Sequence, residues 1–112
     1  MPMDYKTTKF NDTGWEALNT NGTIIGRILN GMATIRIWGY ELTINVAGDP
    51  YQLLLLPSKY IPNRSIPFIM TKALANPETV SGVILKDSPA RIRAYSNKTG
   101  KFVLYGSVTY PI

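Results

Sequence analysis

One stretch decides the fold: Asn30-Gly31-Met32-Ala33-Thr34-Ile35-Arg36-Ile37-Trp38-Gly39-Tyr40-Glu41-Leu42-Thr43-Ile44-Asn45-Val46. Asn-Gly readily adopts the two positive φ values of a type I′ turn, whose twist matches paired antiparallel strands. In the run that follows, Ala33, Ile35 and Ile37 point one way and the residues between them point the other. This period of two predicts a β-strand with one buried face. Residues 23–29 supply its partner, and Gly39 predicts a bulge or bend.

Further short strands are expected on both sides of this central antiparallel ribbon. Turn signals rich in Gly, Pro and Asn separate them, and no helical period is present. The sequence therefore predicts an all-β fold, a single antiparallel β-sandwich or barrel of seven to eight short strands. We expect residues 1–13 to form a lead-in or linker and residues 14–112 to form the folded domain. The other expected strands are 14–18, 51–56, 66–75, 79–85, 90–95 and 101–110.

Three local patterns make more detailed predictions. The run Leu53-Leu54-Leu55-Leu56 fits a strand that is buried on both faces. Residues 90–95 and 101–110 are expected to pair as a hairpin through the polar loop 96–100. The segment from Ser58 to Pro67 is interrupted by prolines and predicts a long irregular connection in which Tyr60 is packed.

Composition excludes several classes of site. The 112 residues include no cysteine and no histidine, so disulfides, thiolate nucleophiles, His-based triads and zinc sites built on Cys or His are ruled out. No phosphate loop, dinucleotide fingerprint or calcium loop is present, and we expect no cofactor and no metal. No apolar run approaches the roughly 20 residues of a membrane helix, and no signal-peptide pattern begins the chain, so we expect no membrane insertion.

The net charge of +5 is unevenly distributed along the chain. Residues 1–58 carry four Lys or Arg against five Asp or Glu, whereas residues 59–112 carry eight against two. A basic half can attract an anionic polymer such as nucleic acid or a phosphate-bearing cell-wall glycan. The same charges are also explained by a solvated face that keeps the domain soluble.

The order of the motifs resembles a known family. Roughly residues 12–112 are similar to the C-terminal head domains of phage tail-fibre and baseplate receptor-binding proteins, especially those from phages of Gram-positive bacteria. The stalk that forms trimers in that family, a coiled coil or collagen-like repeat, is not found in this sequence. The motifs that carry the resemblance are Asp12-Thr13-Gly14-Trp15, Ile35-Arg36-Ile37-Trp38-Gly39 after Asn-Gly, Leu56-Pro57-Ser58-Lys59-Tyr60-Ile61-Pro62, and the ending Gly106, Val108, Tyr110, Pro111.

The resemblance implies a head domain in the virion, at the phage tail or baseplate. Such a head is typically a homotrimer, contacts other tail or baseplate proteins, and acts extracellularly at the host cell surface. It binds host cell-wall or cell-surface polysaccharide during adsorption without cleaving it, so we expect no enzyme. The Leu-Pro-x-x-Tyr-x-Pro segment around Tyr60 is structural in that family, and we do not include it in the site.

Saccharide recognition needs an aromatic face for the apolar side of a pyranose and polar groups for its hydroxyls. Arg91, Arg93 and Tyr95 share the outer face of one expected strand, and the expected hairpin would bring Tyr105 and Lys101 beside them. Trp38 and Tyr40 form a second aromatic pair, with Arg36 on the same face as Trp38. The predicted saccharide-binding residues are therefore Tyr95, Arg93, Arg91, Tyr105, Trp38 and Tyr40.

Other interpretations compete with these assignments. Charges at Arg91 and Arg93 also protect an exposed strand from edge pairing. Trp38 fits a core or subunit-interface position, which we favour slightly because large aromatics are usually buried, and Trp15 fits a structural anchor. Tyr95 and Tyr105 would serve a trimer interface equally well.

Two other functions, besides saccharide recognition, fit parts of the sequence. One is a structural virion module for oligomerisation or tail assembly. The other is a small basic OB-like barrel for single-stranded nucleic acid, which the scattered cations and the surplus of strands disfavour. An enzyme is the weakest option, and Asp49 with Asp87 is the one carboxylate pair that we would test.

Overall fold

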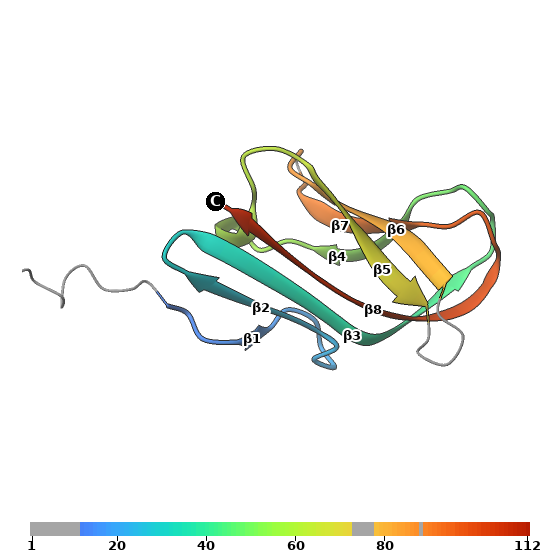
Figure 1. Cartoon of the computed structure of the whole chain (residues 1–112), viewed down its shortest axis with the longest axis horizontal. Coiled ribbons are helices and arrows are strands. Elements are labelled where there is room, and N and C mark those ends of the chain that lie inside the picture. Colours follow the sequence, from blue (N-terminus) through green and yellow to red (C-terminus); the bar gives the residue numbers. More distant parts are fainter. Residues whose placement is uncertain (1–11, 73–77, 88) are drawn as a thin grey trace, which may run out of the picture.

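The computed structural model describes residues 12–72, 78–87 and 89–112, and these residues are all-β (Figure 1). They contain eight antiparallel strands and one turn of 3₁₀ helix, and no α-helix. The last three predicted residues of 66–75 lie outside the described part. The elements are β1 (Glu16–Ala17), β2 (Ile24–Leu29), β3 (Met32–Ile44), β4 (Tyr51–Leu55), η1 (Ser58–Tyr60), β5 (Ile66–Lys72), β6 (Glu78–Leu85), β7 (Arg91–Tyr95) and β8 (Gly100–Pro111).

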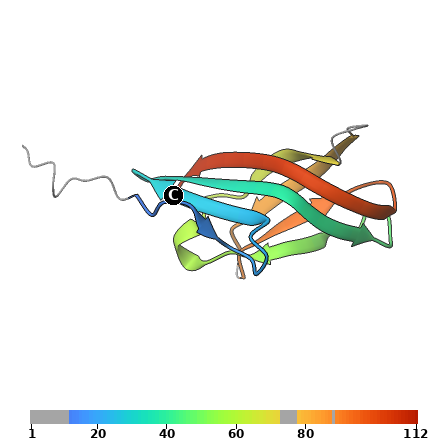
Figure 2. The same ribbon diagram turned by 90° about the horizontal axis from the view of Figure 1, so that it is seen from below.

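All eight strands belong to one sheet in the order β1-β2-β3-β8-β5-β6-β7-β4. The sheet curls on itself into a half-barrel, so β2, β3 and the first described residues form one wall and β4 lies opposite (Figure 2). The long strands β3 and β8 pair antiparallel from Met32↔Pro111 to Ile44↔Gly100 and form the longest ladder of the sheet. The predicted all-β fold is confirmed.

The central ribbon forms as its sequence predicts. Asn30 and Gly31 have φ values of 51° and 80°, and the β2–β3 hairpin closes at Leu29↔Met32. Gly39 has a φ of 81°, and the β3–β8 register shifts between Trp38 and Tyr40. The predicted bulge is therefore present.

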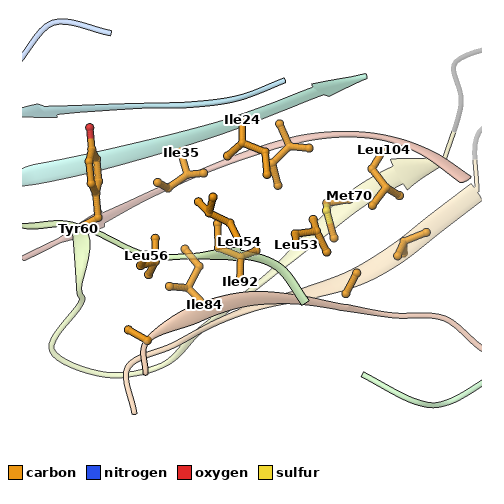
Figure 3. Close-up of a cluster of buried hydrophobic side chains, with 14 of the residues drawn as sticks. Ile24, Ile35, Leu53, Leu54, Leu56, Tyr60, Met70, Ile84, Ile92 and Leu104 are labelled. Carbon is orange, nitrogen blue, oxygen red and sulfur yellow. The ribbon is translucent and has the colours of Figure 1, made fainter. Parts of the chain in front are cut away.

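The core lies between the two walls of the curled sheet (Figure 3). Ile24 and Ile35 reach inward from one wall, and Leu54, Ile84 and Ile92 reach inward from the other. Removing each such aliphatic side chain from water contributes about 1.5–3 kcal/mol, so this layer supplies much of the driving force for folding. The rest of the buried set is Ile28, Ala33, Ile37, Ile44, Leu53, Leu56, Tyr60, Met70, Val80, Ala90, Ala94, Phe102, Leu104 and Tyr110.

The proline-rich connection around η1 links β4 back to the other wall. Tyr60 is completely buried, and its ring packs over Gly26 of β2 so closely that a Cβ atom on Gly26 would lie 2.8 Å from it. The Tyr110 hydroxyl donates a hydrogen bond of 2.8 Å to the Tyr60 carbonyl oxygen. Lys59 forms a 2.7 Å ion pair with Glu16 of β1. The predicted packing of Tyr60 within this connection is confirmed.

The predicted hairpin between residues 90–95 and 101–110 is wrong. β7 pairs with β4 and β6, whereas β8 pairs with β3 and β5. Strand length accounts for the difference: twelve-residue β8 matches the thirteen residues of β3, and five-residue β7 matches the five of β4. The loop after β7 therefore crosses between the walls.

The expectation that the leucine run is buried on both faces is also wrong. Leu55 is 54% exposed, while Leu53, Leu54 and Leu56 are buried. A register shift between Gln52 and Leu54 turns two consecutive leucines inward. The sheet is single and packs only its inner face on the core, so the outer face of β4 that carries Leu55 meets solvent.

Gly26→Ala tests the close packing of Tyr60 on β2. The added methyl group would overlap the Tyr60 ring, and we expect the free energy of unfolding to fall by about 1–3 kcal/mol, measured by chemical denaturation. Thr43→Ser on the exposed face of β3 is the control, and it should change the free energy of unfolding by less than about 0.5 kcal/mol. Equal stability of Gly26→Ala and the control would contradict this packing.

Candidate functional site

The structure divides five of the six predicted site residues between two parts of the outer face. Trp38 and Tyr105 are directly opposite each other on β3 and β8. Arg91, Arg93 and Tyr95 alternate with buried Ile92 and Ala94 on β7 and so share its outer face, as predicted. Because β7 and β8 are not neighbours, Tyr95 does not lie beside Tyr105.

Trp38 stands on the outer face of the sheet and is 54% exposed, so the core interpretation is wrong. The rings of Trp38 and Tyr105 meet edge to face, with centroids 4.9 Å apart and an interplanar angle of 81°. The Arg36 guanidinium carbon lies 5.3 Å from the centroid of the Trp38 ring. Both contacts are favourable arrangements for aromatic rings, and they support the indole in this orientation while leaving much of it accessible.

A groove of about 340 Å³ opens beside this indole, and we call it the Trp38 groove. Its size is at the lower end of the range for small-molecule sites. Trp15, expected as a structural anchor, is instead 49% exposed and lines the groove together with residues of β3 and β8. Sequence reasoning missed this because no local pattern relates Trp15 to Trp38. The groove is lined by Trp15, Thr34, Arg36, Trp38, Gly106 and Ser107.

Trp15 is held by the segment that precedes β1. The Arg27 guanidinium carbon lies 6.0 Å from the Trp15 ring centroid. Arg27 donates two hydrogen bonds to the Asp12 carboxylate, at 3.0 and 2.7 Å, and Asp12 also accepts one from the Gly14 amide at 2.8 Å. These bonds, those from Arg27 above all, lower the pKa of Asp12 from 3.8 to about 2. The carboxylate is therefore charged throughout the neutral range.

Arg36 contributes the available positive charge of the Trp38 groove. Within residues 12–72, 78–87 and 89–112, it forms no ion pair with a carboxylate. Five other cations of this part of the chain do form ion pairs: Arg27 with Asp12, Lys59 with Glu16, Lys72 and Lys98 with Glu78, and Lys101 with Glu41. Arg36 can thus donate hydrogen bonds to a bound polar group.

Tyr40 does not stand beside Trp38, and the expected pair is wrong. The bulge at Gly39 places Tyr40 opposite buried Leu104, on the inner face of the sheet. Its ring packs against the core and its hydroxyl donates a hydrogen bond of 3.3 Å to the Leu53 carbonyl oxygen. Burial raises the pKa of the Tyr40 hydroxyl.

A second groove, of about 380 Å³, lies at the end of β7, and we call it the Tyr95 groove. Lys98 donates its amide to the Ser96 hydroxyl at 3.1 Å, and the Gly48 amide donates to the Ser96 carbonyl at 2.8 Å, so the bordering turns are fixed. One aromatic ring among hydroxyls and an amide suits a polyhydroxylated ligand. The groove is lined by Gly48, Thr79, Ser81, Tyr95, Ser96 and Asn97.

The arginines of β7 lie outside this lining. Arg91 donates a hydrogen bond to the Pro89 carbonyl oxygen, which ties it to the preceding turn. Arg93 stands opposite Val83 of β6 and Gln52 of β4. Both remain on the outer face, and their part in ligand binding stays a prediction.

Asp49 and Asp87 lie at opposite ends of β7. The turn containing Asp49 is bonded to Ser96 through Gly48, whereas Asp87 follows β6 near Leu85↔Arg91. Five residues of strand span roughly 16 Å, which exceeds the separation of a glycosidase pair. The described residues also hold no cluster of three acidic groups suited to a metal ion, and no helix among them is long and apolar enough to cross a membrane.

No protein-family model matches the chain, and no curated protein matches it. A solved structure does: the head domain of phage bIL170, described with the receptor-binding domains of lactococcal phages. The TM-score is 0.70 and the match covers 88% of this chain and 97% of that one. The fold is that of a phage receptor-binding head domain. At 13% identity the likeness establishes the shared fold alone, so the binding residues of this head-domain fold must be argued from its own surface.

Arg27→Gln should raise the pKa of Asp12 from about 2 toward 3.8, as followed by NMR titration of the side-chain carboxyl carbon. Since the folded-state pKa lies below the unfolded value, the ion pair stabilises the native chain above pH 3.8, and this contribution is lost as the pH falls toward 2. In Arg27→Gln, the free energy of unfolding should not show this decrease between pH 3.8 and pH 2. A wild-type Asp12 that titrates near 3.8 would contradict the bidentate contact.

Proposed function

We propose that this chain is the receptor-recognising head of a phage tail or baseplate protein, and that it binds host cell-surface polysaccharide without cleaving it. The single observation that carries the proposal is the exposed indole of Trp38, flanked by Arg36 and Tyr105 on a sheet with this fold. An aromatic ring that is already supported by neighbouring side chains loses less conformational freedom on binding. It would act in the virion, outside the host cell.

The chemistry of the outer face supports a saccharide over the alternatives. Aromatic faces accept the apolar side of a pyranose, and guanidinium, hydroxyl and amide groups accept or donate the bonds of its hydroxyls. A nucleic-acid site would need a basic groove, but among the described residues Arg36 is the one cation lining the Trp38 groove and the Tyr95 groove is lined by none. The eight-stranded curled sheet also differs from a five-stranded OB barrel. Trp38, Tyr105 and Tyr95 are the principal ligand-binding residues of the proposal.

Trp38→Ala should weaken binding to cell-wall polysaccharide from lactococci and other Gram-positive bacteria by about tenfold or more, since it removes the stacking surface. Binding is measured by calorimetry on the full chain. Trp38 is exposed, so the variant should keep its fold, which circular dichroism checks. Tyr40→Phe is the matched aromatic control and should bind normally because Tyr40 faces the core. Undiminished binding by Trp38→Ala would remove Trp38 from the site, and a chain that binds none of the polysaccharides would refute the function.

A second candidate, a homotrimeric interface on the same face, is favoured by its exposed apolar side chains. Ile69 is 62% exposed, Trp38 54% and Met32 42%, and all three project outward from β5 and β3. If three copies of the chain associated through this face, the apolar side chains would be removed from water. Such a trimer would be the head of a longer protein that joins other tail proteins. In this case the surface serves assembly.

Light scattering behind a sizing column separates the two candidates. If the wild type has three times the chain mass and Trp38→Ala has the monomer mass, the face is a subunit interface. A mass that Trp38→Ala leaves unchanged, whether monomer or trimer, is the result expected if the face serves the ligand.

A further inference from the structure

Trp15 enters the Trp38 groove from a different part of the sheet than the rest of the lining. The other five lining residues belong to β3 and β8. Trp15 directly precedes β1, which contains two residues and stands first in the sheet order, beside β2. The position of its indole therefore depends on how this edge segment is held against β2.

Two anchors hold the edge segment, one on each side of Trp15. Before it, the Thr13 amide donates a hydrogen bond of 3.0 Å to the Ile28 carbonyl oxygen, and the Ile28 amide donates one of 3.0 Å to the Thr13 hydroxyl. After it, Glu16 pairs with β2 and accepts two hydrogen bonds from Lys59, at 2.8 and 2.7 Å. The backbone on both sides is thus held against the sheet, while the indole between the anchors is 49% exposed.

Arg27 links the Trp15 ring to β2. Its guanidinium carbon lies 6.0 Å from the centroid of the indole ring, which is within reach of a cation–π contact. Its two hydrogen bonds to the Asp12 carboxylate orient the guanidinium plane, and a bidentate contact of this kind needs the planar fork of arginine. Asp12 in turn accepts the Gly14 amide at the turn that leads to Trp15. Arg27 is therefore placed to determine the direction in which this indole points.

The two indoles reach the groove from positions well apart on the sheet. Trp15 lies beside Arg27 of β2, whereas the Trp38 amide donates a hydrogen bond of 2.8 Å to the Thr23 carbonyl oxygen, just before β2 begins. Four residues of extended chain span roughly 13 Å. Arg36 pairs with the residue of β2 midway along this stretch. A ligand in the groove can therefore contact an indole at each end and a guanidinium group between them.

We propose that Trp15 is a second ligand-binding residue of the Trp38 groove and that Arg27 is its positioning residue. This inference rests on the proposed function and deepens it, because it adds an aromatic face to the site and names the side chain that orients it. Two indoles offer apolar faces to a saccharide, and Arg36 offers donors to its hydroxyls. Arg27 is engaged by Asp12 and lies outside the lining of the groove, so it acts through the Trp15 ring.

Fluorescence tests the positioning role without any ligand. In a Trp38→Phe background Trp15 is the one tryptophan of the chain, so its emission is measured alone. Arg27→Gln in this background should move the emission maximum to longer wavelength and increase quenching by acrylamide, because the indole loses its neighbouring guanidinium and meets more water. Lys101→Gln, which removes a cation paired with Glu41, is the matched control and should change neither quantity. Unchanged Trp15 emission in Arg27→Gln would overturn the positioning role.

Calorimetric titration with a polysaccharide fragment that binds the wild type tests the ligand contact. Trp15→Ala should weaken binding about tenfold because it removes one aromatic face, and Trp15→Phe should retain part of the lost affinity. Circular dichroism checks that both variants keep the fold, as expected for a half-exposed side chain. Wild-type affinity in Trp15→Ala, together with weakened binding in Trp38→Ala, would overturn the Trp15 contact and leave the receptor-binding proposal intact.

A double variant separates positioning by Arg27 from direct contact with the ligand. Arg27→Gln alone should weaken binding about threefold to tenfold, yet it should add less than about twofold when Trp15 is already alanine. Arg27→Lys keeps the charge without the planar fork, so its affinity should fall between those of Arg27→Gln and the wild type. A further loss of about tenfold in the double variant would mean that Arg27 binds the ligand itself, which would overturn its positioning role. A chain that binds no polysaccharide would overturn the proposed function and the Trp15 contact together.

Discussion

The structure depends on the pairing of β3 with β8. Among the described strands, β8 alone joins the β1-β2-β3 part of the sheet to the β5-β6-β7-β4 part, through its partners β3 and β5. β8 approaches β5 closely at Gly106, where a Cβ atom would lie 3.0 Å from the Met70 side chain. Loss of this pairing would separate the two walls of the core. It would also separate Trp38 from Tyr105, so the fold and the proposed site share one constraint.

The bulge at Gly39 decides which aromatics reach the surface. Strict alternation would leave Trp38 and Tyr40 on the same face, but the register shift between them sends Trp38 outward and Tyr40 into the core. A positive φ of 81° at this position is accessible to glycine without steric cost. Bulges commonly redirect side chains near functional sites. The bulge at Gly39 therefore places Trp38 on the outer face and Tyr40 in the core.

Local patterns predicted the elements well, and long-range pairing limited the prediction of the site. Alternation and turn residues suffice for β2, β3 and β8, because each side chain's face follows from a period of two. Which strands become neighbours depends on strand length and on the curl of the whole sheet, and no local signal reports either. Hence Tyr95 was expected beside Tyr105, and Trp15 was not expected beside Trp38. The exposure of Trp38 is likewise a property of the assembled sheet.

The central claim is that host polysaccharide binds on the outer face at Trp38. Chemical-shift mapping tests it most directly, because the chain has two tryptophans and both line the Trp38 groove. Titration of ¹⁵N-labelled protein with a binding polysaccharide fragment should shift both indole N–H signals, together with the amides of Arg36 and Tyr105. Indole signals that stay in place while binding perturbs other parts of the sheet would contradict the account.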